Sequence, residues 1–480
     1  MNTLARTAEP ATQTDAQRPL ISRTLAQFAH DLTLDAIPQE VRERAKHLIL
    51  DATGIAYASG GYDFAHKTLT AIAGLGGAGY VPVIGLPQRL SPRDAALVNG
   101  ILAHGLDFDD THTGGVIHST ASVWPAVLSA AFMRGKSGAD LLVGYVAGVE
   151  AATRLGAVGS GHFHQVGFHP TGVIGIFGCT LAAGRLMGLS PQAMTMAQGI
   201  ALSMAAGSLE FLEDGAWTKR MHPGWAAQSG ITAAALGREG FVGPTRAYEG
   251  RFGVFNAYLQ GGLEDDRMGR ATAGLGSIWE TTAIAVKPLP ACHFTHACAD
   301  AAMILARQHQ FEIGDIVRIK ALVPGEVVKT VCEPVANKRR PANAYDAQFS
   351  IPYLVAASLI RGRFTLAELE PEALSDGAIL RLCDLVDYEV DPRSTFPRHY
   401  TGEVQISLRD GRVLMHREAM NRGCADRPLS NAEIVEKYAG NARLRLSARQ
   451  AAEVQAAVLA LDETADARPI IDRICQAAPQ

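Results

Sequence analysis

Residues 41–55 read Val-Arg-Glu-Arg-Ala-Lys-His-Leu-Ile-Leu-Asp-Ala-Thr-Gly-Ile, and this stretch indicates the fold class of the chain. Six of its apolar residues recur at steps of three and four, which places them on one face of an α-helix. They are Val41, Ala45, Leu48, Ile49, Ala52 and Ile55. The same helical period continues from residue 21 to about residue 262, so we expect a mostly α protein with one large all-helical domain.

The other helices expected in this half are rich in alanine and glycine. They cover residues 91–103, 122–133, 138–155, 172–187, 190–207 and 225–237. Two of them begin with Ser-Pro, at Ser91 and Ser190, which suits an N-cap residue followed by proline in the first turn. Because small side chains let helices approach closely, we expect these helices to pack as one bundle.

The pattern changes near Gly274, where apolar and polar residues begin to alternate with a period of two. The expected strands are 316–323, 403–408 and 413–416. The last two are joined by a turn that contains Asp410 and Gly411, and such an Asp-Gly turn is a strong hairpin signal. Helical stretches at 297–308 and 349–361 lie between the strands, so we expect a smaller α+β domain here.

Helical periodicity returns near the C-terminus, where Ser430 stands three residues before Glu433 as in a capping box. A chain of 480 residues exceeds what one hydrophobic core usually serves. We expect the last helices to rejoin the first domain. The expected organisation is a flexible tail (1–19), a helical domain (20–270), an inserted α+β domain (271–425) and C-terminal helices that complete the helical domain (426–480).

The composition is that of a globular protein, with 48% hydrophobic residues, 19% charged residues and a net charge of −4. This charge gives no general attraction to nucleic acid. Seven scattered cysteines, an odd number without metal-binding spacing, indicate reduced thiols. The polar N-terminus does not resemble a signal peptide, and we find no uninterrupted apolar run of the roughly 18–20 residues that a membrane span needs. We therefore expect a cytoplasmic protein without a membrane partner.

Residues 103–118 concentrate three carboxylates and three imidazoles in one short segment. These are Asp107, Asp109, Asp110, His104, His112 and His118. Crowded titratable groups of different kinds are typical of active sites, because neighbouring charges separate their pKa values into an acid and a base. Three later segments, 161–172, 218–224 and 287–296, hold further histidines and lysines among small residues.

Suppose that the substrate is a small di- or tricarboxylate. Removing a proton from carbon next to a carboxylate adds charge to an oxygen that is already anionic, so cations must stabilise it. The candidates are Lys219, Arg220, His222 and His296. His118 and His169 suit proton transfer at neutral pH, and Asp107 could orient a histidine. We assign substrate contacts to Arg220, His222, Thr111 and His104.

Together the four segments resemble the MmgE/PrpD family, which includes 2-methylcitrate dehydratase, cis-aconitate decarboxylase and iminodisuccinate epimerase. The resemblance implies a helical domain of N- and C-terminal parts, an inserted lid domain, an active site at their junction and a homodimer. It also implies catalytic roles for five residues of this chain. They are Asp107, His118, His169, Lys219 and His296.

We therefore expect a cofactor-independent lyase of small polycarboxylates, of the 2-methylcitrate dehydratase type. Decarboxylation of the cis-aconitate type and epimerisation of the iminodisuccinate type are close alternatives, because all three involve proton transfer next to a carboxylate. The sequence offers no nucleotide-binding loop and no credible metal ligand set. We therefore expect neither a cofactor nor a metal.

Two other classes of protein were weighed against this interpretation. A metal-dependent helical enzyme could use the acidic run at 107–110, or His104, Asp107, His112 and His118 as ligands. The spacing, however, is not that of a helical ligand pair. A non-enzymatic dimeric scaffold would have no need of histidines in four separate segments. Several polar residues are interpreted as scaffold or as the rim of the site and not as catalysts, namely Asp109, Asp110, His104, His112, His162, His164 and His293. Cys292 is not expected to be a nucleophile.

Overall fold

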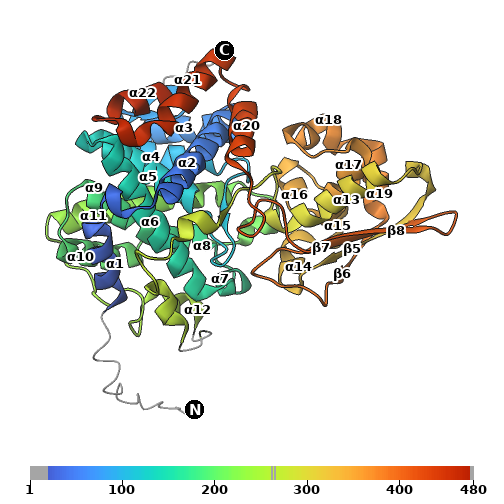
Figure 1. Ribbon diagram of the computed structural model, residues 1–480, viewed down its shortest axis with the longest axis horizontal. Helices are drawn as coiled ribbons and strands as arrows, with labels where there is room; N and C mark the ends of the chain where they lie inside the picture. Colours follow the sequence, from blue (N-terminus) through green and yellow to red (C-terminus); the bar gives the residue numbers. More distant parts are fainter. Residues whose placement is uncertain (1–19, 261–262, 264–265, 476–480) are drawn as a thin grey trace, which may run out of the picture.

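The computed structural model describes residues 20–260, 263 and 266–475; the expected flexible tail, 1–19, lies outside the described residues. The protein is mostly α-helical and has two parts lying side by side (Figure 1). One part consists of helices, and the other places helices against a four-stranded sheet. Each part has a large hydrophobic cluster of its own.

The helical part contains the long helices that the sequence indicates. Its helices are α1 (Ile21–Asp31), α2 (Gln39–Ser59), α3 (Asp63–Gly76), α4 (Pro92–Ala103), α5 (Ser119–Arg134), α6 (Gly138–Gly159), α7 (His162–Gln165), α8 (Pro170–Val173), α9 (Gly175–Leu186), α10 (Pro191–Leu202), α11 (Thr218–Arg238) and α12 (Val254–Leu259). A short hairpin of β1 (Val81–Val83) and β2 (Leu86–Leu90) precedes α4. The Ser91 and Ser190 side chains accept backbone N–H bonds at the starts of α4 and α10, which confirms both N-caps.

Glycines allow the closest helix contacts in this bundle. A Cβ atom on Gly100 of α4 would lie 2.4 Å from the Cα atom of Gly224 on α11. A Cβ atom on Gly178 of α9 would lie equally close, 2.4 Å, to the carbonyl oxygen of Gly148 on α6. Since real Cβ atoms do not approach so closely, these crossings require glycine, and the expectation of tightly packed small-residue helices is confirmed.

Several helix boundaries differ from those expected. The stretch 172–187 is divided at Ile174 into α8 and α9, and the stretch 190–207 ends at Leu202. The helix expected to begin at residue 225 instead begins at Thr218, with Pro223 inside it. Proline usually marks a helix boundary, so the sequence pattern placed the start too late. The consequence is functional, because α11 then carries the Lys219 segment on a rigid element.

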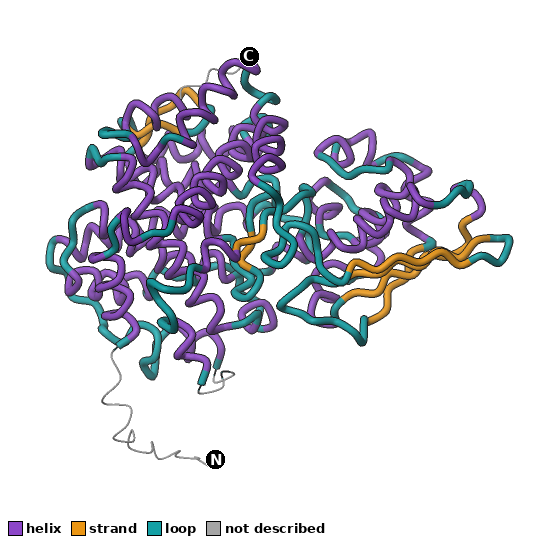
Figure 2. The backbone as a smooth tube through the Cα atoms, in the orientation of Figure 1, coloured by secondary structure: helices purple, strands orange, loops and turns teal. Residues whose placement is uncertain are grey.

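The α+β part is built on a sheet with strand order β6-β5-β7-β8 (Figure 2). Strands β5 (Ile316–Val323), β7 (Gly402–Leu408) and β8 (Val413–Glu418) match the expected ones, and β7 and β8 form the expected hairpin. Strand β6 (Val386–Val390), parallel to β5, was not foreseen. The helices of this part are α13 (His296–Gln308), α14 (Val328–Val331), α15 (Val335–Arg339), α16 (Ala344–Gln348), α17 (Ile351–Arg361), α18 (Pro371–Leu374) and α19 (Gly377–Asp384).

The C-terminal helices lie against the N-terminal ones, far from them in sequence (Figure 1). They are α20 (Asn431–Ala442), α21 (Ala448–Leu459) and α22 (Arg468–Cys475). Ser430 and Glu433 form the capping box at the start of α20, as expected. Buried Ile434, Tyr438 and Ile474 belong to the hydrophobic cluster of the helical part. The two ends of the chain therefore share one core.

Helix α6 is long and apolar enough to cross a membrane by length and composition, but 94% of its apolar window is buried inside the protein. Its capping box, formed by Ser137 and Asp140, fixes its start. It therefore serves as a core helix of the bundle.

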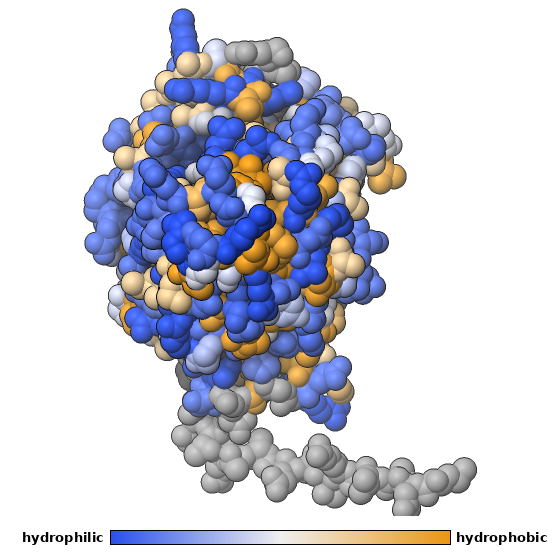
Figure 3. Space-filling view, turned by 90° about the vertical axis from the view of Figure 1, so that its right-hand side faces the viewer, coloured by the Kyte–Doolittle hydropathy of each residue, from blue (hydrophilic) through white to orange (hydrophobic). Residues whose placement is uncertain are grey.

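Seen from the end of the α+β part, the surface is mainly hydrophilic, with hydrophobic residues gathered in a central area (Figure 3).

Candidate active site

A cavity lies where the helical and α+β parts meet, and both parts contribute to its wall. Its polar lining residues are Asp107, Thr111, His118, His164, His169, Lys219, Lys287, Cys292, His293, Thr330 and Tyr400. The cavity volume is about 40 Å³, which is room for a few water molecules. Pockets that hold small organic ligands usually measure about 300–1,000 Å³, so the cavity is narrow in this conformation.

A two-stranded ladder joins two of the segments that the sequence indicates. Strand β3 (Thr111–His112) pairs with β4 (Ile284–Ala285), so that Thr111 lies opposite Ala285. The chain leaves β4 directly toward Lys287. The ladder thus brings the acidic segment 103–118 beside the Lys-Pro segment 287–296.

Asp107 is held between two lysines at the centre of the site. Its Oδ1 atom accepts hydrogen bonds from the Nζ atoms of Lys219, at 2.6 Å, and Lys287, at 2.9 Å. Burial alone would raise the pKa of Asp107, but the two ammonium groups outweigh it and hold this pKa well below its usual value. Asp107 also has a positive φ of 49°, a left-handed conformation that few residues adopt. The triad therefore carries a net positive charge in a strained, buried loop.

The orientation of His118 follows from its hydrogen bonds. It is the N-cap residue of α5, and its Nδ1 atom lies 2.7 Å from the carbonyl oxygen of Asp110. Because a carbonyl oxygen only accepts, Nδ1 carries the proton and Nε2 keeps a free lone pair. Burial lowers the pKa of His118 well below its usual value; Asp109 opposes this shift and Lys287 adds to it. The imidazole is therefore neutral at pH 7.

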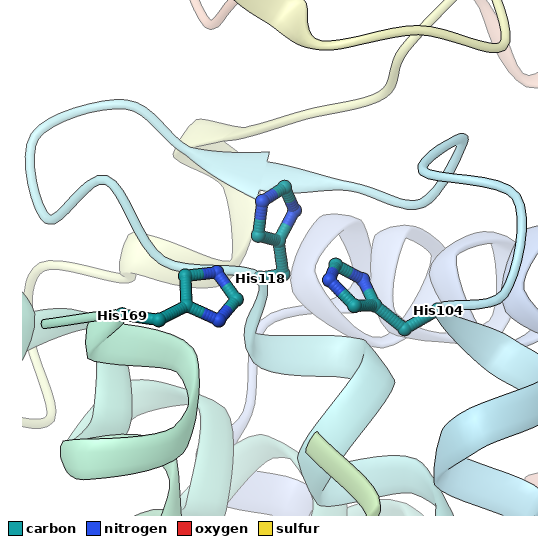
Figure 4. Close-up of side chains that lie close together, drawn as sticks. All are labelled: His104, His118 and His169. Carbon is teal, nitrogen blue, oxygen red and sulfur yellow. The ribbon is translucent and has the colours of Figure 1, made fainter. Parts of the chain in front are cut away.

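Two more histidines lie beside His118 (Figure 4). The ring centroid of His104 is 4.8 Å from that of His118, and the His169 centroid is 5.8 Å from both. His104 is bound through Nδ1 to Asp109 at 2.8 Å, and His169 is bound through Nδ1 to Nδ1 of His222 at 3.0 Å. All three come from helix ends, His104 at the C-cap of α4 and the other two at N-caps.

The irregular segment 105–110 is buried, so its backbone carbonyl groups need partners inside the protein. Side chains from distant parts of the chain supply most of them. The Gly105 carbonyl accepts from Arg220, that of Leu106 from Gln348, that of Asp107 from Lys287, and that of Phe108 from Lys437. Lys437 also pairs with buried Asp51 at 2.8 Å. The shape of this segment therefore depends on contacts with distant parts of the chain.

The structure brings some of the expected site residues together and places others outside the cavity wall. Asp107, Thr111, His118, His169 and Lys219 line the cavity. His104 and His222 lie directly behind it, each bonded to another side chain. Two of the expected site residues, Arg220 and His296, do not line the cavity. The guanidinium group of Arg220 stacks between the rings of Phe64 and Tyr345, and His296 is fully buried with Nε2 bonded to the Ala291 carbonyl oxygen.

Six polar lining residues had no catalytic or binding role assigned from the sequence; besides Cys292 and Thr330, these are Lys287, His164, His293 and Tyr400. Lys287 stood in one of the recognised segments, and a buried lysine beside an acidic cluster was the signal that could have identified it. His164 and His293 were interpreted as scaffold; burial lowers their pKa values to about 4 and about 3. Tyr400 comes from the α+β part and had no sequence signal, because its place depends on how the two parts meet.

The three imidazoles also bear on the question of a metal. Nitrogen atoms of His104, His118 and His169 lie within 4.8 Å of one another, as do ligand atoms of His104, Asp107 and Asp109. Neutral imidazoles could hold an ion such as Zn²⁺. The ammonium groups of Lys219 and Lys287, however, already occupy one oxygen of Asp107, and they would repel a cation.

The family models and the similar proteins that match this chain agree with one another. The MmgE/PrpD N-terminal domain matches residues 23–265, and the MmgE/PrpD C-terminal domain matches residues 289–463. A cis-aconitate decarboxylase-like protein of Aspergillus oryzae, oryM, is 28% identical over 471 residues, covering 94% of this chain and 96% of that protein. The cis-aconitate decarboxylase of Aspergillus terreus is 26% identical over 474 residues (94% and 95%), and that of Homo sapiens 29% over 447 residues (89% of each).

Proposed function

The chain belongs to the MmgE/PrpD family and is an enzyme of the lyase class, and we propose that it decarboxylates a small tricarboxylate of the cis-aconitate type. The names of its relatives favour this reaction over the dehydration that the sequence analysis placed first. The observation that carries the proposal is the Lys219–Asp107–Lys287 triad beside neutral imidazoles in one cavity.

The charges of the site suit a polycarboxylate. Lys219 and Lys287 together carry two positive charges, and Asp107 cancels one of them. Neutral His164, His293 and Tyr400 add hydrogen-bonding groups to the wall. A buried anion is stable only when such groups satisfy it. Because fixed cations act more strongly away from water, they can stabilise charge that develops during the reaction.

The reaction itself is simple to balance. The bond between carbon and the departing carboxylate breaks, CO₂ leaves, and the electron pair of that bond stays on carbon. This charge spreads into the neighbouring unsaturated carboxylate, beside which the two lysines would lie. A proton then binds the carbon. Each turnover therefore consumes one proton and releases one CO₂, and the proton must come from a group of the cavity.

His118 and His169 are the groups best placed to handle that proton. Both rings line the cavity, and each is held by a hydrogen bond through Nδ1 that leaves Nε2 unbonded among the described residues. A bound tricarboxylate would raise the proton affinity of both rings, because a nearby anion favours the charged imidazole. Substrate binding and proton uptake are therefore expected to occur together.

The test is a product assay by NMR in D₂O with purified protein. The substrates are cis-aconitate, citrate and 2-methylcitrate. The proposal requires CO₂ release from cis-aconitate and one deuterium in the product. Water loss from 2-methylcitrate without CO₂ release would instead support dehydration, and exchange without net reaction would support epimerisation.

Two further expectations belong to the same proposal. Activity is expected to survive exhaustive dialysis against EDTA, because the proposed chemistry uses only side chains; recovery that depends on adding Mg²⁺, Fe²⁺ or Zn²⁺ would contradict it. The homodimer expected from the sequence stays a prediction. Light scattering at micromolar protein concentration measures it directly.

A further inference from the structure

We infer that His222 is a proton relay that carries protons from a surface pocket to His169 inside the cavity. The inference rests on the proposed decarboxylation, because a reaction that consumes one proton per turnover must reload its proton donor. His169 is 1% exposed and His222 is 5% exposed, so neither ring is freely solvated. What distinguishes them is that each faces a different cavity.

The two rings stand back to back between an inner and an outer space. His169 lines the inner cavity together with Asp107 and Lys219. His222 is absent from that wall and instead lines a second pocket with Ser208 and Met221. This second pocket opens at the surface, since Met221 and Trp225 of its wall are 43% and 38% exposed.

A single hydrogen bond connects the two spaces. The Nδ1 atoms of His169 and His222 are 3.0 Å apart, and their ring centroids 5.2 Å. Two nitrogens at this distance must share one proton, with one ring donating and the other accepting. An imidazole can take a proton at one nitrogen and release another from its second nitrogen. The pair therefore has the atoms that a relay needs.

The neighbouring backbone fixes this geometry. The N–H group of His169 donates to the carbonyl oxygen of Gly207 at 3.0 Å. A Cβ atom on Gly207 would lie 3.5 Å from Nδ1 of His222, and a Cβ atom on Gly172 would lie 2.2 Å from the Ala206 carbonyl oxygen. The rings are thus held by close backbone packing. His222 itself is on α11, the same rigid helix that carries Lys219.

The proton path can be written atom by atom. His222 takes a proton at Nε2 from water or an acid in the outer pocket, and its Nδ1 proton passes to Nδ1 of His169. His169 then releases its Nε2 proton to the delocalised carbanion that the loss of CO₂ leaves. One proton enters and one is consumed. Water that enters after product release restores the starting tautomers. Exposed Glu210 and Asp214 also line the outer pocket.

The decisive experiment uses His222→Gln and His222→Ala in the full-length protein. Glutamine can still donate a hydrogen bond to His169 but cannot pass a proton onward, so it separates positioning from relay. We expect kcat of His222→Gln to fall on the order of 10²-fold, as for loss of an acid–base group, with little change in KM. In His222→Ala, added imidazole is expected to restore kcat in a concentration-dependent manner.

Two controls make the result specific. Met221→Leu changes the outer pocket one residue away and is expected to keep wild-type kcat without an imidazole effect. Nitrogen-15 NMR of histidine-labelled resting protein is expected to show one protonated and one unprotonated Nδ1 in the pair. Wild-type kcat in His222→Gln would overturn the relay, and so would failure of imidazole to rescue His222→Ala while it remains folded by circular dichroism. Absence of CO₂ release by wild-type protein would instead overturn the proposed function.

Discussion

The hairpin of β7 and β8 and the segment 104–118 are both short, yet they obtain their shape in opposite ways. In the hairpin, neighbours in sequence bond to each other: the Leu408 N–H donates to Arg412, and the Gly411 N–H donates to Leu408. In the site segment, the carbonyl groups of residues 105–108 accept from side chains 115 to 329 residues away.

Substitutions in the two regions should therefore have different consequences for the folded protein. A hairpin tolerates change because its contacts are local and replaceable by water. The site segment is buried, and an unpaired buried carbonyl costs about 1–3 kcal/mol. We call the side chains that donate to these carbonyl groups the anchors of the segment; they are Arg220, Gln348, Lys287 and Lys437. We expect variants at the anchors to change activity, and variants in the hairpin to change only stability.

The largest effect is expected at the imidazoles that face the cavity. His169→Asn and His118→Asn should each lower kcat, by about 10² to 10⁴ for a group that transfers the proton. His169→Asn is expected to have the larger effect, because His222 lies behind it. Steady-state kinetics with deuterium incorporation measure both. A larger loss at His118 would assign the proton transfer to that residue.

Lys287→Met tests the anchor that also belongs to the site. It removes one of the two ammonium groups on Asp107 and the donor to its carbonyl group. We expect kcat/KM to fall by about 10² to 10³, as when one charge-stabilising donor is removed. His296→Asn serves as the comparison, since His296 does not line the cavity; an equal loss there would mean that the effect is structural.

The pH dependence of kcat/KM tests the protonation state of His169. Burial, then His222 and Lys219, lower the pKa of His169 well below 6.5. Above that pKa the protonated ring becomes scarcer as the pH rises. If substrate binding requires proton uptake, kcat/KM is expected to fall up to about tenfold for each pH unit between pH 6 and 8. A flat profile over this range would indicate that neutral His169 is the active form, as in the relay through His222.

Lys437→Met tests an anchor that does not touch the cavity. It removes the partner of buried Asp51 and the donor to the Phe108 carbonyl. Breaking such a buried pair costs about 3–5 kcal/mol of unfolding free energy, and kcat is expected to fall by less than in Lys287→Met. The double variant Asp51→Asn/Lys437→Met should recover part of the stability in urea unfolding. No recovery would show that the Phe108 contact dominates.

The smallest effect is expected in the hairpin. Gly411 has a φ of 88°, and a Cβ atom there would meet nothing within 4 Å. Gly411→Ala is therefore expected to lower the unfolding free energy by about 1 kcal/mol, because alanine adopts a positive φ less readily than glycine. Its kcat and KM should match the wild type. Altered kinetics would show that the sheet communicates with the site.

The hairpin and the main helices were predictable because their signals are local. The Asp410-Gly411 turn, the alternation of residues 316–323 and the Ser430 cap each depend on a few neighbouring residues, and each appears in the structure as expected. Strand β6 was missed. The start of α11 was misplaced by seven residues because Pro223 usually marks a boundary.

By itself, the sequence determined the residue types of the site, the helical class of the protein and its family, since these depend on composition, period and motif. Only the tertiary structure decided that Lys287 joins Asp107, that Arg220 holds a backbone carbonyl, and that His169 and His222 face different cavities. The physical reason is burial. A buried charge or carbonyl is stable only beside a partner, and the partners of the Asp107 carboxylate and of the Gly105 carbonyl come from positions more than 100 residues away, where no local pattern can indicate them.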